Sequence, residues 1–465
     1  MCRKFSFDFL QNLQMLPLAS DADNIYIASC KPLSLEHLEE IQNVFRDKFI
    51  KNVLSDSYAI ERHLNALRIE DRLEKLSLKL KQELAQNAKE DEQSCVSVIF
   101  DFILTEALAL NSSDIHIEMR AHDTLVRFRI DGILSFFCVL EEEVCRALIF
   151  HIKFLAHLNV AESRKAQDGS FERNFKDCQY DFRISTLPIL WGESVVIRIL
   201  KHDIALLDLD GLCLDSFHLH LLKSKIALPH GMILITGPTG SGKSTTLYAC
   251  LNALKSIEKK IITAEDPIEY KLPLIQQIML NSKAGLDFSN ALRAILRQDP
   301  DIIMIGEIRD EESLDIAIKS ALTGHLLLST LHTNDALSTL ERLIDMGAKP
   351  YLIASALKLI IAQRLVRKLC PHCKEKSKAH TEFEGEFHTS KGCKWCNYSG
   401  FLGRELVGEF LELDEGLREL IRTKADKMQI LAQARKNGFQ TMLECGLEKA
   451  RKGRISLEEL LRVVG

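Results

Sequence analysis

A glycine-rich segment with the spacing Gly237-x-x-x-x-Gly242-Lys243-Ser244 has the residue types needed to bind phosphate. It follows the apolar run 232–235 and leads into a stretch with a helical pattern. A turn in this position directs its backbone N–H groups at a phosphate from the positive end of the helix. We therefore predict an ATP site, with Lys243 on the β- and γ-phosphates and the Ser244 hydroxyl on Mg²⁺. The residues assigned to the loop are Gly237, Pro238, Thr239, Gly240, Ser241, Gly242, Lys243, Ser244 and Thr245.

Two glutamates that follow apolar runs are the candidates for the chemistry of hydrolysis. Glu265 ends the run in "ITAEDPIEY" (262–270), and Glu307 ends the run in "IIMIGEIRD" (302–310). Phosphoryl transfer to water needs a carboxylate to hold the metal and a group to orient or deprotonate the water. We predict that Glu307 and Glu265 share these roles, and the sequence does not decide which residue takes which. The other interpretation of Glu265 is a plain helix cap.

Two histidines flank the buried run of "TGHLLLSTLHTND" (323–335), His325 before it and His332 after it. We expect both to border the same crevice as the glutamates, where His332 would sense the γ-phosphate. A structural role as a hydrogen-bond donor is the alternative for each of them.

Four cysteines form two C-x2-C pairs, "CPHC" (370–373) and "CKWC" (393–396). Their spacing is typical of a structural zinc site with Cys370, Cys373, Cys393 and Cys396 as ligands. Four thiolates leave no open coordination position, so the metal would serve to fold the segment. The alternatives are a redox pair, which neither surrounding sequence pattern favours, and unrelated free thiols.

The elements that must position these residues alternate between residue 215 and about residue 370. The apolar runs "MILIT", "KIITAE", "IIMIGE" and "HLLLSTLH" predict buried strands, and the segments between them predict helices, as in a parallel sheet covered on both faces. Residues 1 to about 90 predict exposed amphipathic helices that end in a polar linker. Residues 96 to about 201 predict a helix and short strands, with Asp131-Gly132 as a tight turn. The last 55 residues or so, from 411 to 465, have a helical pattern.

Composition narrows the class of protein. A chain of 465 residues with 46% apolar and 27% charged residues predicts a globular protein of two to four domains. The net charge of -5 gives no overall indication of nucleic-acid binding. No apolar run approaches the roughly 18 to 20 residues that cross a bilayer, and the first residues lack the continuous apolar region of a secretion signal. The odd number of cysteines, 13, fits reduced thiols plus a metal site, so we expect a cytoplasmic protein.

Several segments together resemble a known family. They are "GPTGSGKSTTLYA", "ITAEDPIEY", "LRAILRQDPDIIMIGEIRD", "TGHLLLSTLHTNDA" and "QRLVRKLCPHC". Their order and spacing resemble the Walker A, aspartate box, Walker B, histidine box and cysteine-adjacent segments of the type II secretion and type IV pilus assembly ATPases. "SDIHIEM", "VRFRIDG", "FRISTLP" and "GESVVIRIL" are similar to the middle domain of that family. The resemblance covers about residues 95–463, and we find no match for the first 90 residues.

The resemblance implies an α/β fold with a RecA-like P-loop ATPase core and a parallel sheet. It implies three regions: residues 1–92, helical with a linker; residues 93–203, an α+β, PAS-like middle domain; and residues 212–465, the ATPase domain. The last region would include a four-cysteine zinc-binding insertion at 366–400 and the C-terminal helices at 411–465.

The resemblance also implies a function, that of a homohexameric cytoplasmic motor peripheral to the inner face of the inner membrane. Such a motor couples ATP hydrolysis to a polytopic platform protein and so drives assembly of a pseudopilus, a pilus or a DNA-uptake pilus. Arg183 and Arg198 match middle-domain arginines that reach the nucleotide, and Arg293 and Arg297 match arginines of the core. A guanidinium aimed at the γ-phosphate stabilises the charge that develops in transfer. Surface or salt-bridged positions are the alternative for all four.

Three other functions compete with the assembly motor. A nucleic-acid translocase or helicase would need a basic channel with aromatic residues, whereas this chain has two tryptophans and an acidic balance, so we expect no direct nucleic-acid binding. A nucleotide-gated scaffold with little turnover would not need Glu265 and Glu307. A retraction motor of the same superfamily generally lacks the four cysteines.

Overall fold

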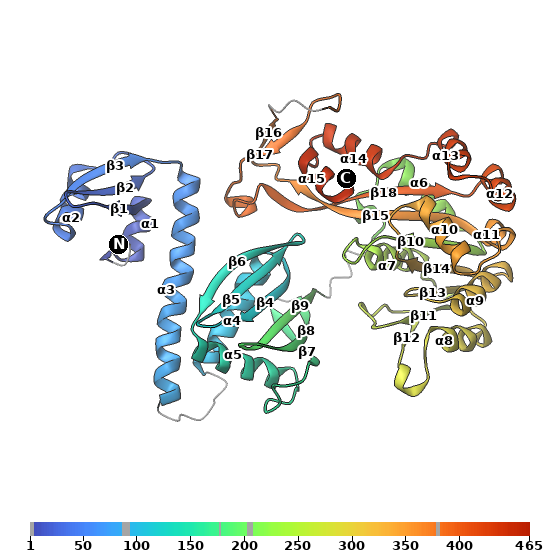
Figure 1. Ribbon diagram of the computed structural model, residues 1–465, viewed down its shortest axis with the longest axis horizontal. Coiled ribbons are helices and arrows are strands. Elements are labelled where there is room, and N and C mark those ends of the chain that lie inside the picture. The colour runs from blue at the N-terminus through green and yellow to red at the C-terminus, as the bar shows by residue number, and fades with distance from the viewer. Residues whose placement is uncertain (1–3, 86–93, 176–177, 202–207, 378–381) are drawn as a thin grey trace. The chain divides into compact units, whose positions relative to one another are not determined.

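The computed structural model describes residues 4–85, 94–175, 178–201, 208–377 and 382–465 (Figure 1). The chain divides into two compact units. Unit 1 consists of Met1–Lys201, Cys370–Cys373 and Ser390–Leu402, and unit 2 consists of His202–Leu369, Lys374–Thr389 and Gly403–Gly465. The predicted phosphate loop therefore belongs to unit 2, and the two C-x2-C pairs belong to unit 1.

The N-terminal part of unit 1 is a small mixed domain. Its elements are α1 (Phe7–Leu13), β1 (Met15–Ser20), β2 (Asn24–Ser29), α2 (Leu35–Val44), β3 (Phe49–Leu54) and the start of α3 (Ser57–Ala85). Strand β2 pairs antiparallel with β1 and parallel with β3. The prediction of helices throughout was wrong for β1–β3, because the strands are short and β3 exposes most of its side chains without an apolar alternation. The predicted polar linker lies at 86–93, outside the described residues.

The long helix α3 contributes to two hydrophobic cores of unit 1. Ile60 and Leu64 in its first half are buried in the core of the N-terminal sheet. Leu73 and Leu80 in its second half are buried in the core of the middle domain. One continuous helix is therefore a structural element of both domains.

The middle domain is a six-stranded antiparallel sheet with helices on one face. Its elements are α4 (Cys95–Ala109), β4 (Ser112–Met119), β5 (Thr124–Ile130), β6 (Ile133–Leu140), α5 (Glu142–Leu155), β7 (Gln167–Phe175), β8 (Cys178–Ile189) and β9 (Gly192–Lys201). The strand order is β6-β5-β4-β9-β8-β7. The predicted turn at Asp131-Gly132 is confirmed: both residues have positive φ, +48° and +87°, as a tight turn between β5 and β6 requires. Helices α4 and α5 pack with the buried side chains of the sheet into one core.

Unit 2 is built on a seven-stranded sheet in the order β12-β11-β13-β14-β10-β15-β18. The strands from β12 to β15 pair in parallel, as predicted. Its elements up to the cysteines are α6 (Ser216–Ile226), β10 (Gly231–Thr236), α7 (Lys243–Leu254), β11 (Ile261–Glu265), β12 (Ile275–Met279), α8 (Phe288–Ile295), β13 (Ile302–Ile305), α9 (Glu311–Leu322), β14 (Leu326–Leu331), α10 (Ala336–Asp345), α11 (Pro350–Ala356) and β15 (Leu357–Leu369). The later elements are β16 (Lys374–Lys376), β17 (His388–Ser390), β18 (Phe401–Glu412), α12 (Glu415–Arg422), α13 (Lys427–Lys436), α14 (Met442–Arg451) and α15 (Leu457–Val464).

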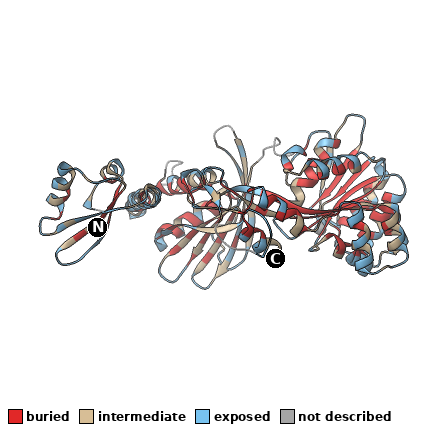
Figure 2. Ribbon diagram, turned by 90° about the horizontal axis from the view of Figure 1, so that it is seen from above, coloured by how far each residue is buried: buried red, intermediate tan, exposed pale blue. Residues whose placement is uncertain are grey.

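Both faces of the parallel sheet are buried (Figure 2). Along β10, Met232 and Leu234 belong to one core, together with residues of α8 to α15. Ile233 and Ile235 belong to the core on the other face, together with α6 and α7. A sheet covered in this way can present polar side chains to a ligand only where its strands end.

Candidate functional site

The phosphate loop joins the carboxyl end of β10 to the start of α7. Gly237, Gly240 and Gly242 have φ values of +148°, +79° and +88°, which residues with a side chain rarely adopt. A Cβ at Gly237 would also lie 2.5 Å from the carbonyl oxygen of Gln363. The shape of the turn therefore requires glycine at the predicted positions.

Unpaired hydrogen-bond donors gather in this loop. The Ser241 hydroxyl is buried and has no hydrogen-bond partner among the described residues. The first N–H groups of α7 have no partner within the helix either. Pro238, Thr239 and Gly240 are exposed, and Ser244 and Thr245 are half-buried in the first turn. Such a set of donors at a helix N-terminus fits a phosphate group.

Lys243 folds over the loop. Its Nζ donates to the carbonyl oxygens of Gly237 at 2.7 Å and Pro238 at 3.0 Å. Burial lowers the pKa of Lys243, and the charge of Glu307 acts in the opposite direction. The structure thus brings the predicted phosphate-binding lysine and one predicted catalytic glutamate into the same electrostatic environment.

Gln363 on β15 forms hydrogen bonds to the phosphate loop and to helix α7, and it was not among the predicted site residues. Its Nε2 donates to the carbonyl oxygen of Ser241 at 2.9 Å, and its Oε1 accepts from the Thr246 hydroxyl at 3.0 Å. The Gln363 side chain is fully buried. It lies 117 to 122 residues away from its partners in sequence, so no local motif could have indicated the contact.

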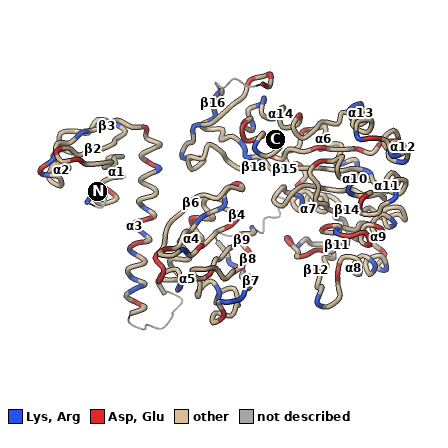
Figure 3. Tube along the Cα trace, in the orientation of Figure 1, with Lys and Arg blue, Asp and Glu red and all other residues tan. Residues whose placement is uncertain are grey.

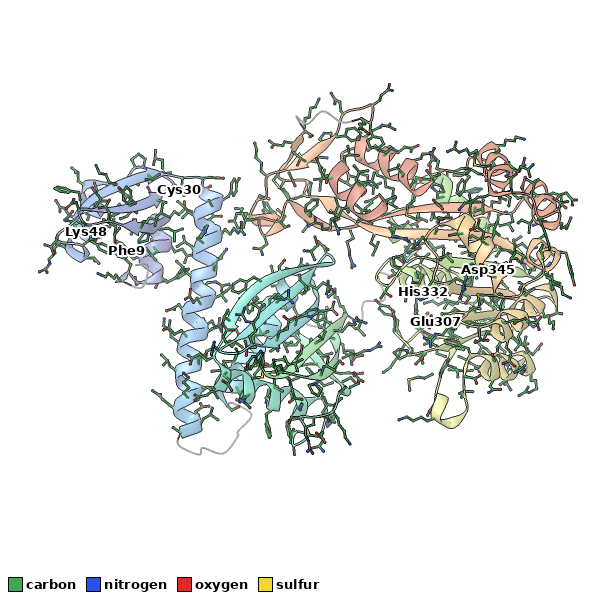
Figure 4. All side chains as sticks on the ribbon, in the orientation of Figure 1. Phe9, Cys30, Lys48, Glu307, His332 and Asp345 are labelled. Carbon is green, nitrogen blue, oxygen red and sulfur yellow. The ribbon has the colours of Figure 1, made fainter. Side chains whose placement is uncertain are left out.

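Glu307 follows β13, and Figure 4 labels it together with His332. Arg309 forms an ion pair with its Oε1, and His332 Nε2 lies 3.3 Å from its Oε2. The Glu307 side chain is 19% exposed, whereas that of His332 is 54% exposed. The structure therefore joins Glu307 and His332 as predicted, and it adds Arg309, which lies two positions after Glu307 in the same motif.

The loop that carries His332 is attached to the phosphate-loop strand. The hydroxyl of Thr236, the last residue of β10, accepts from the backbone N–H of Thr333 at 2.9 Å. The same hydroxyl lies 2.5 Å from the Thr333 hydroxyl, which lies 2.7 Å from that of Thr339. These bonds place the histidine loop beside the end of β10.

His325 lies at the opposite end of the sheet from His332. Strand β14 runs parallel to β10, with Leu326 beside Gly231 and Leu331 beside Thr236. The phosphate loop follows Thr236, at the carboxyl end of β10. His325 precedes Leu326 and therefore lies at the other end of these two strands. Its Nδ1 lies 3.0 Å from the carbonyl oxygen of Ser320. The expectation that His325 borders the same crevice as the glutamates was wrong, because the residues before and after a strand lie at opposite ends of that strand.

Glu265 ends β11 in a buried network. It is 3% exposed, and its Oε1 accepts from the Thr263 hydroxyl at 2.6 Å and from Gln277 Nε2 at 3.1 Å. The Tyr248 hydroxyl, from α7, bonds to its Oε2. That hydroxyl also accepts from the backbone N–H groups of Glu269 at 3.1 Å and Tyr270 at 3.3 Å.

Tyr248 therefore links the phosphate-loop helix to the segment after β11. Burial and then the neighbouring Glu265 charge raise the pKa of Tyr248. Tyr248 was not among the predicted site residues, although it lies at the apolar end of the quoted loop motif. A tyrosine within an apolar helix pattern gives no signal that separates a packing role from a polar one.

Arg293 and Arg297 are neighbours at the end of α8. Arg297 Nη1 donates to the carbonyl oxygen of Arg293 at 3.0 Å, and Arg293 pairs with Glu312 of α9 at 2.5 Å. Both are surface side chains of unit 2.

Arg183 and Arg198 lie in the middle of strands in unit 1. They are direct partners in the β8–β9 ladder. Arg198 Nε lies 3.2 Å from Asp114 Oδ1, and Arg183 Nε lies 3.6 Å from Asp181 Oδ2. They are therefore paired with acids of their own sheet.

The four predicted zinc ligands converge. Their sulfur atoms all lie within 4.8 Å of one another, with Cys370–Cys393, Cys373–Cys396 and Cys393–Cys396 at 3.7, 3.8 and 3.8 Å. Zn–S bonds of about 2.3 Å place the corners of a tetrahedron about 3.8 Å apart. The observed spacing fits a zinc site with four cysteine ligands and is far longer than the roughly 2.05 Å of a disulfide.

Known proteins resemble this chain in sequence over most of its length. The family model described as "Type II/IV secretion system protein" matches residues 88–462. The chain belongs to this family. The Type II secretion system ATPase E of Vibrio cholerae is 38% identical, over 99% of this chain and 96% of that protein. The Type IV pilus assembly ATPase TfpB of Acinetobacter baylyi is 42% identical, over 82% of this chain and 67% of that protein.

Solved structures agree with the family at the level of fold. The pilus retraction motor PilT with bound ADP has a TM-score of 0.54 and 29% identity, covering 77% of this chain and 95% of that one. The Legionella pneumophila ATPase DotB has a TM-score of 0.60 and 23% identity, covering 78% and 95%. The prediction of a secretion or pilus ATPase is thus confirmed for the family to which the chain belongs.

A second family model corrects the analysis of the N-terminal region. The model described as "MshEN domain" matches residues 1–72. The statement that the first 90 residues have no match was therefore wrong, and the small mixed domain seen in the structure corresponds to this region. Among the described residues, no helix combines the length and apolar character that a membrane span requires.

Proposed function

We propose that this member of the secretion family hydrolyses ATP to drive assembly of a type II secretion pseudopilus or a type IV pilus, including a pilus for DNA uptake. It works as a homohexamer in the cytoplasm, peripheral to the inner membrane, on a polytopic platform protein. One observation carries the proposal: the Glu307–His332 pair and the glycine-rich loop before Lys243 lie at the carboxyl ends of the neighbouring strands β13, β14 and β10.

The residues of unit 2 would divide the work of hydrolysis. The loop amides and Lys243 hold the β- and γ-phosphates, and Ser244 holds Mg²⁺, which neutralises charge on the transferred group when bound. Glu307 and Glu265 hold the metal and orient the water between them, and His332 responds to the γ-phosphate.

The arginines would make hydrolysis depend on the position of a domain. Arg183 and Arg198 bring positive charge from the PAS-like middle domain, and Arg293 and Arg297 bring it from the core. Arginines of this kind accelerate phosphoryl transfer by roughly 10³ to 10⁵ in other enzymes. Delivery from a separate domain would convert the chemical step into movement.

The four-cysteine site would bind zinc as a structural ion. The sulfur spacing supports the assignment, and the metal would contribute to folding without touching the nucleotide. Elemental analysis of the purified chain should give one zinc per protomer. A chain in which Cys370 and Cys393 are both replaced by serine should give none.

The function is tested with the full chain and two candidate partners. We expect ATP turnover to rise when rings form, and to rise further with cytoplasmic loops of a polytopic membrane protein encoded nearby. Stimulation by DNA instead would support the translocase alternative. Glu307→Gln should trap ATP in a ring, whereas turnover by this variant at the wild-type rate would contradict the role of Glu307.

A further inference from the structure

Four charged side chains form a line across the middle-domain sheet, which we name the arginine row. In the strand order β5-β4-β9-β8, Arg129 is the ladder partner of Asp114, Asp114 of Arg198, and Arg198 of Arg183. The residues that follow or precede them in β4 and β9 are buried in the core, so the row lies on the opposite face. Figure 3 shows the basic and acidic positions along these strands.

The composition of the row is costly for folding. The row holds three arginines and one aspartate, and Arg183, which also contacts Asp181, stands directly opposite Arg198. Like charges in directly opposed positions destabilise an antiparallel pair. An arrangement that works against the sheet is expected where the charges serve a ligand, and the excess of positive charge fits an anion.

Asp114 is the centre of the row. It is 6% exposed, and each of its oxygens faces a different partner. Oδ1 lies 3.2 Å from Arg198 Nε, and Oδ2 lies 3.6 Å from Arg129 Nε and accepts from the Ser113 hydroxyl at 2.8 Å. Contacts with Arg129 and Ser113 therefore fix the position of the Asp114 carboxylate that binds Arg198.

The contact restrains Arg198 without enclosing it. Asp114 binds Nε, and the Arg198 side chain remains 60% exposed. An arginine side chain has many rotamers, and this rotamer entropy is lost when its guanidinium is fixed on a phosphate. A carboxylate that already fixes Nε reduces this loss, so the guanidinium is preorganised for the charge that develops in transfer.

We propose that Asp114 is a positioning residue for Arg198, and that Arg129 keeps Asp114 in place from the other side. The inference rests on the proposed function, because it requires Arg198 to act on the terminal phosphate. It goes further by naming the residues on which that arginine depends.

The same strand provides a matched control. Glu118 lies on the same face of β4 and binds Arg127 of β5 through both oxygens, at 2.6 and 2.8 Å. This pair has the chemistry of the Asp114 pair and lies outside the arginine row. A general loss of sheet stability should follow from Asp114→Asn and from Glu118→Gln, whereas a loss of turnover should follow only from the first.

The experiment measures ATP turnover by the full chain in four variants. Arg198→Gln should lower kcat by roughly 10³-fold or more, and Asp114→Asn should lower it by about tenfold to a hundredfold. In Asp114→Asn the KM for ATP should stay within about twofold, and Glu118→Gln should leave both constants within about twofold, since positioning acts on the chemical step. The double variant Asp114→Asn, Arg198→Gln should be no slower than Arg198→Gln, because a residue that acts through Arg198 has no effect once Arg198 is gone.

Each other result decides the matter. Additive losses in the double variant, or an equal loss in Glu118→Gln, would make Asp114 a structural residue only and overturn the proposal. If Arg198→Gln is slow and Asp114→Asn is normal, this proposal fails while the role of Arg198 stands. If Arg198→Gln turns over normally, the role of Arg198 in the proposed function fails as well.

A second variant covers the case in which Asp114→Asn does not fold. Asp114→Glu keeps the charge and displaces it by one methylene group. We expect this chain to fold and to lose kcat by about tenfold, because the guanidinium is held in the wrong place. Wild-type turnover in folded Asp114→Glu would overturn the proposal.

Discussion

The two large sheets of the protein hold their candidate functional residues in different places. In the parallel sheet, Glu307 and His332 follow the ends of β13 and β14. In the antiparallel sheet, Arg183 and Arg198 lie within strands. The parallel sheet is covered on both faces, so only its ends reach a ligand, whereas the antiparallel sheet has helices on one face and can use the middle of its strands. In the parallel sheet, the residues of a site can be identified because each one comes directly after a strand in the sequence. In the antiparallel sheet, the residues that come together depend on the register of the strands.

The largest effect should come from the strand-end site. Lys243→Ala removes the side chain that bonds to the carbonyls of Gly237 and Pro238 and that we assign to the phosphates. We expect ATP binding to be lost and turnover to fall by 10³-fold or more, beyond the order of 10²–10³ that removal of one electrostatic group costs in other enzymes. Equilibrium binding of a fluorescent ATP analogue and steady-state turnover measure the two quantities.

A lysine outside the site serves as the control for that variant. Lys259 is exposed in the connection between α7 and β11. Lys259→Ala should bind and hydrolyse ATP like the wild type. If Lys243→Ala binds ATP as well as the wild type does, the assignment of the nucleotide site to the ends of the parallel strands is wrong.

The mid-strand arginines should affect the rate and leave binding nearly intact. With Arg183 and Arg198 both changed to Gln, we expect kcat to fall by roughly 10³-fold or more, because the negative charge that the arginines would stabilise develops only in transfer. Affinity for ATP should change by no more than a few fold. Arg127→Gln, on the same face but outside the arginine row, is the control, and an unchanged kcat in the double variant would remove the middle domain from catalysis.

A smaller effect should come from the network that supports the strand-end site. Tyr248→Phe removes the bond to Glu265 and leaves the N–H groups of Glu269 and Tyr270 without their acceptor. Unsatisfied buried groups cost about 1–3 kcal/mol of stability, and we expect kcat to fall by about tenfold as Glu265 loses its orientation. Urea unfolding and turnover measure these changes, with the same substitution at exposed Tyr351 as control. Unchanged stability and rate would show that Tyr248 only packs.

The smallest effect on activity should come from Glu459 on α15. Burial opposes its ionisation, but bonds from Arg462 and Arg367 outweigh burial and lower its pKa to about 2. A lowered carboxyl pKa stabilises the fold above the ordinary pKa, and this stability is lost as pH falls from about 4.5 toward 2. Glu459→Gln should lower Tm at pH 7 by about 5 °C and leave turnover within about twofold. Thermal melts at pH 7 and pH 3 check it, since the difference from wild type should shrink at the lower pH.

The sequence alone could predict those parts of the site that depend on local patterns. The phosphate loop, the tight turn at Asp131-Gly132 and the cluster of four cysteines are each fixed by residue types at short spacing. Glu307 and His332 could be predicted to meet because the carboxyl ends of neighbouring parallel strands lie at one edge.

The remaining features depend on contacts between distant segments. Gln363 contacts the phosphate loop from β15, the strand next to β10. The partner of Arg198 is set by the register of β4 against β9. Neither contact leaves a pattern in the sequence. His325 was assigned to the wrong end of the sheet because proximity in sequence was taken for proximity in space. The strands β1–β3 were missed because each has only six residues, and because β3 exposes most of its side chains and so has no period of two.

The shared helix α3 has a consequence for where the chain can be divided. It runs from Ser57 to Ala85, and the MshEN match ends at residue 72, inside it. Each of two cores supplies part of the packing that keeps this helix folded, so melting of one core withdraws support from the other. A cut at the homology boundary would divide α3 in its middle and would separate Ile69 from the middle-domain core against which it packs. The two domains should therefore unfold as one cooperative body.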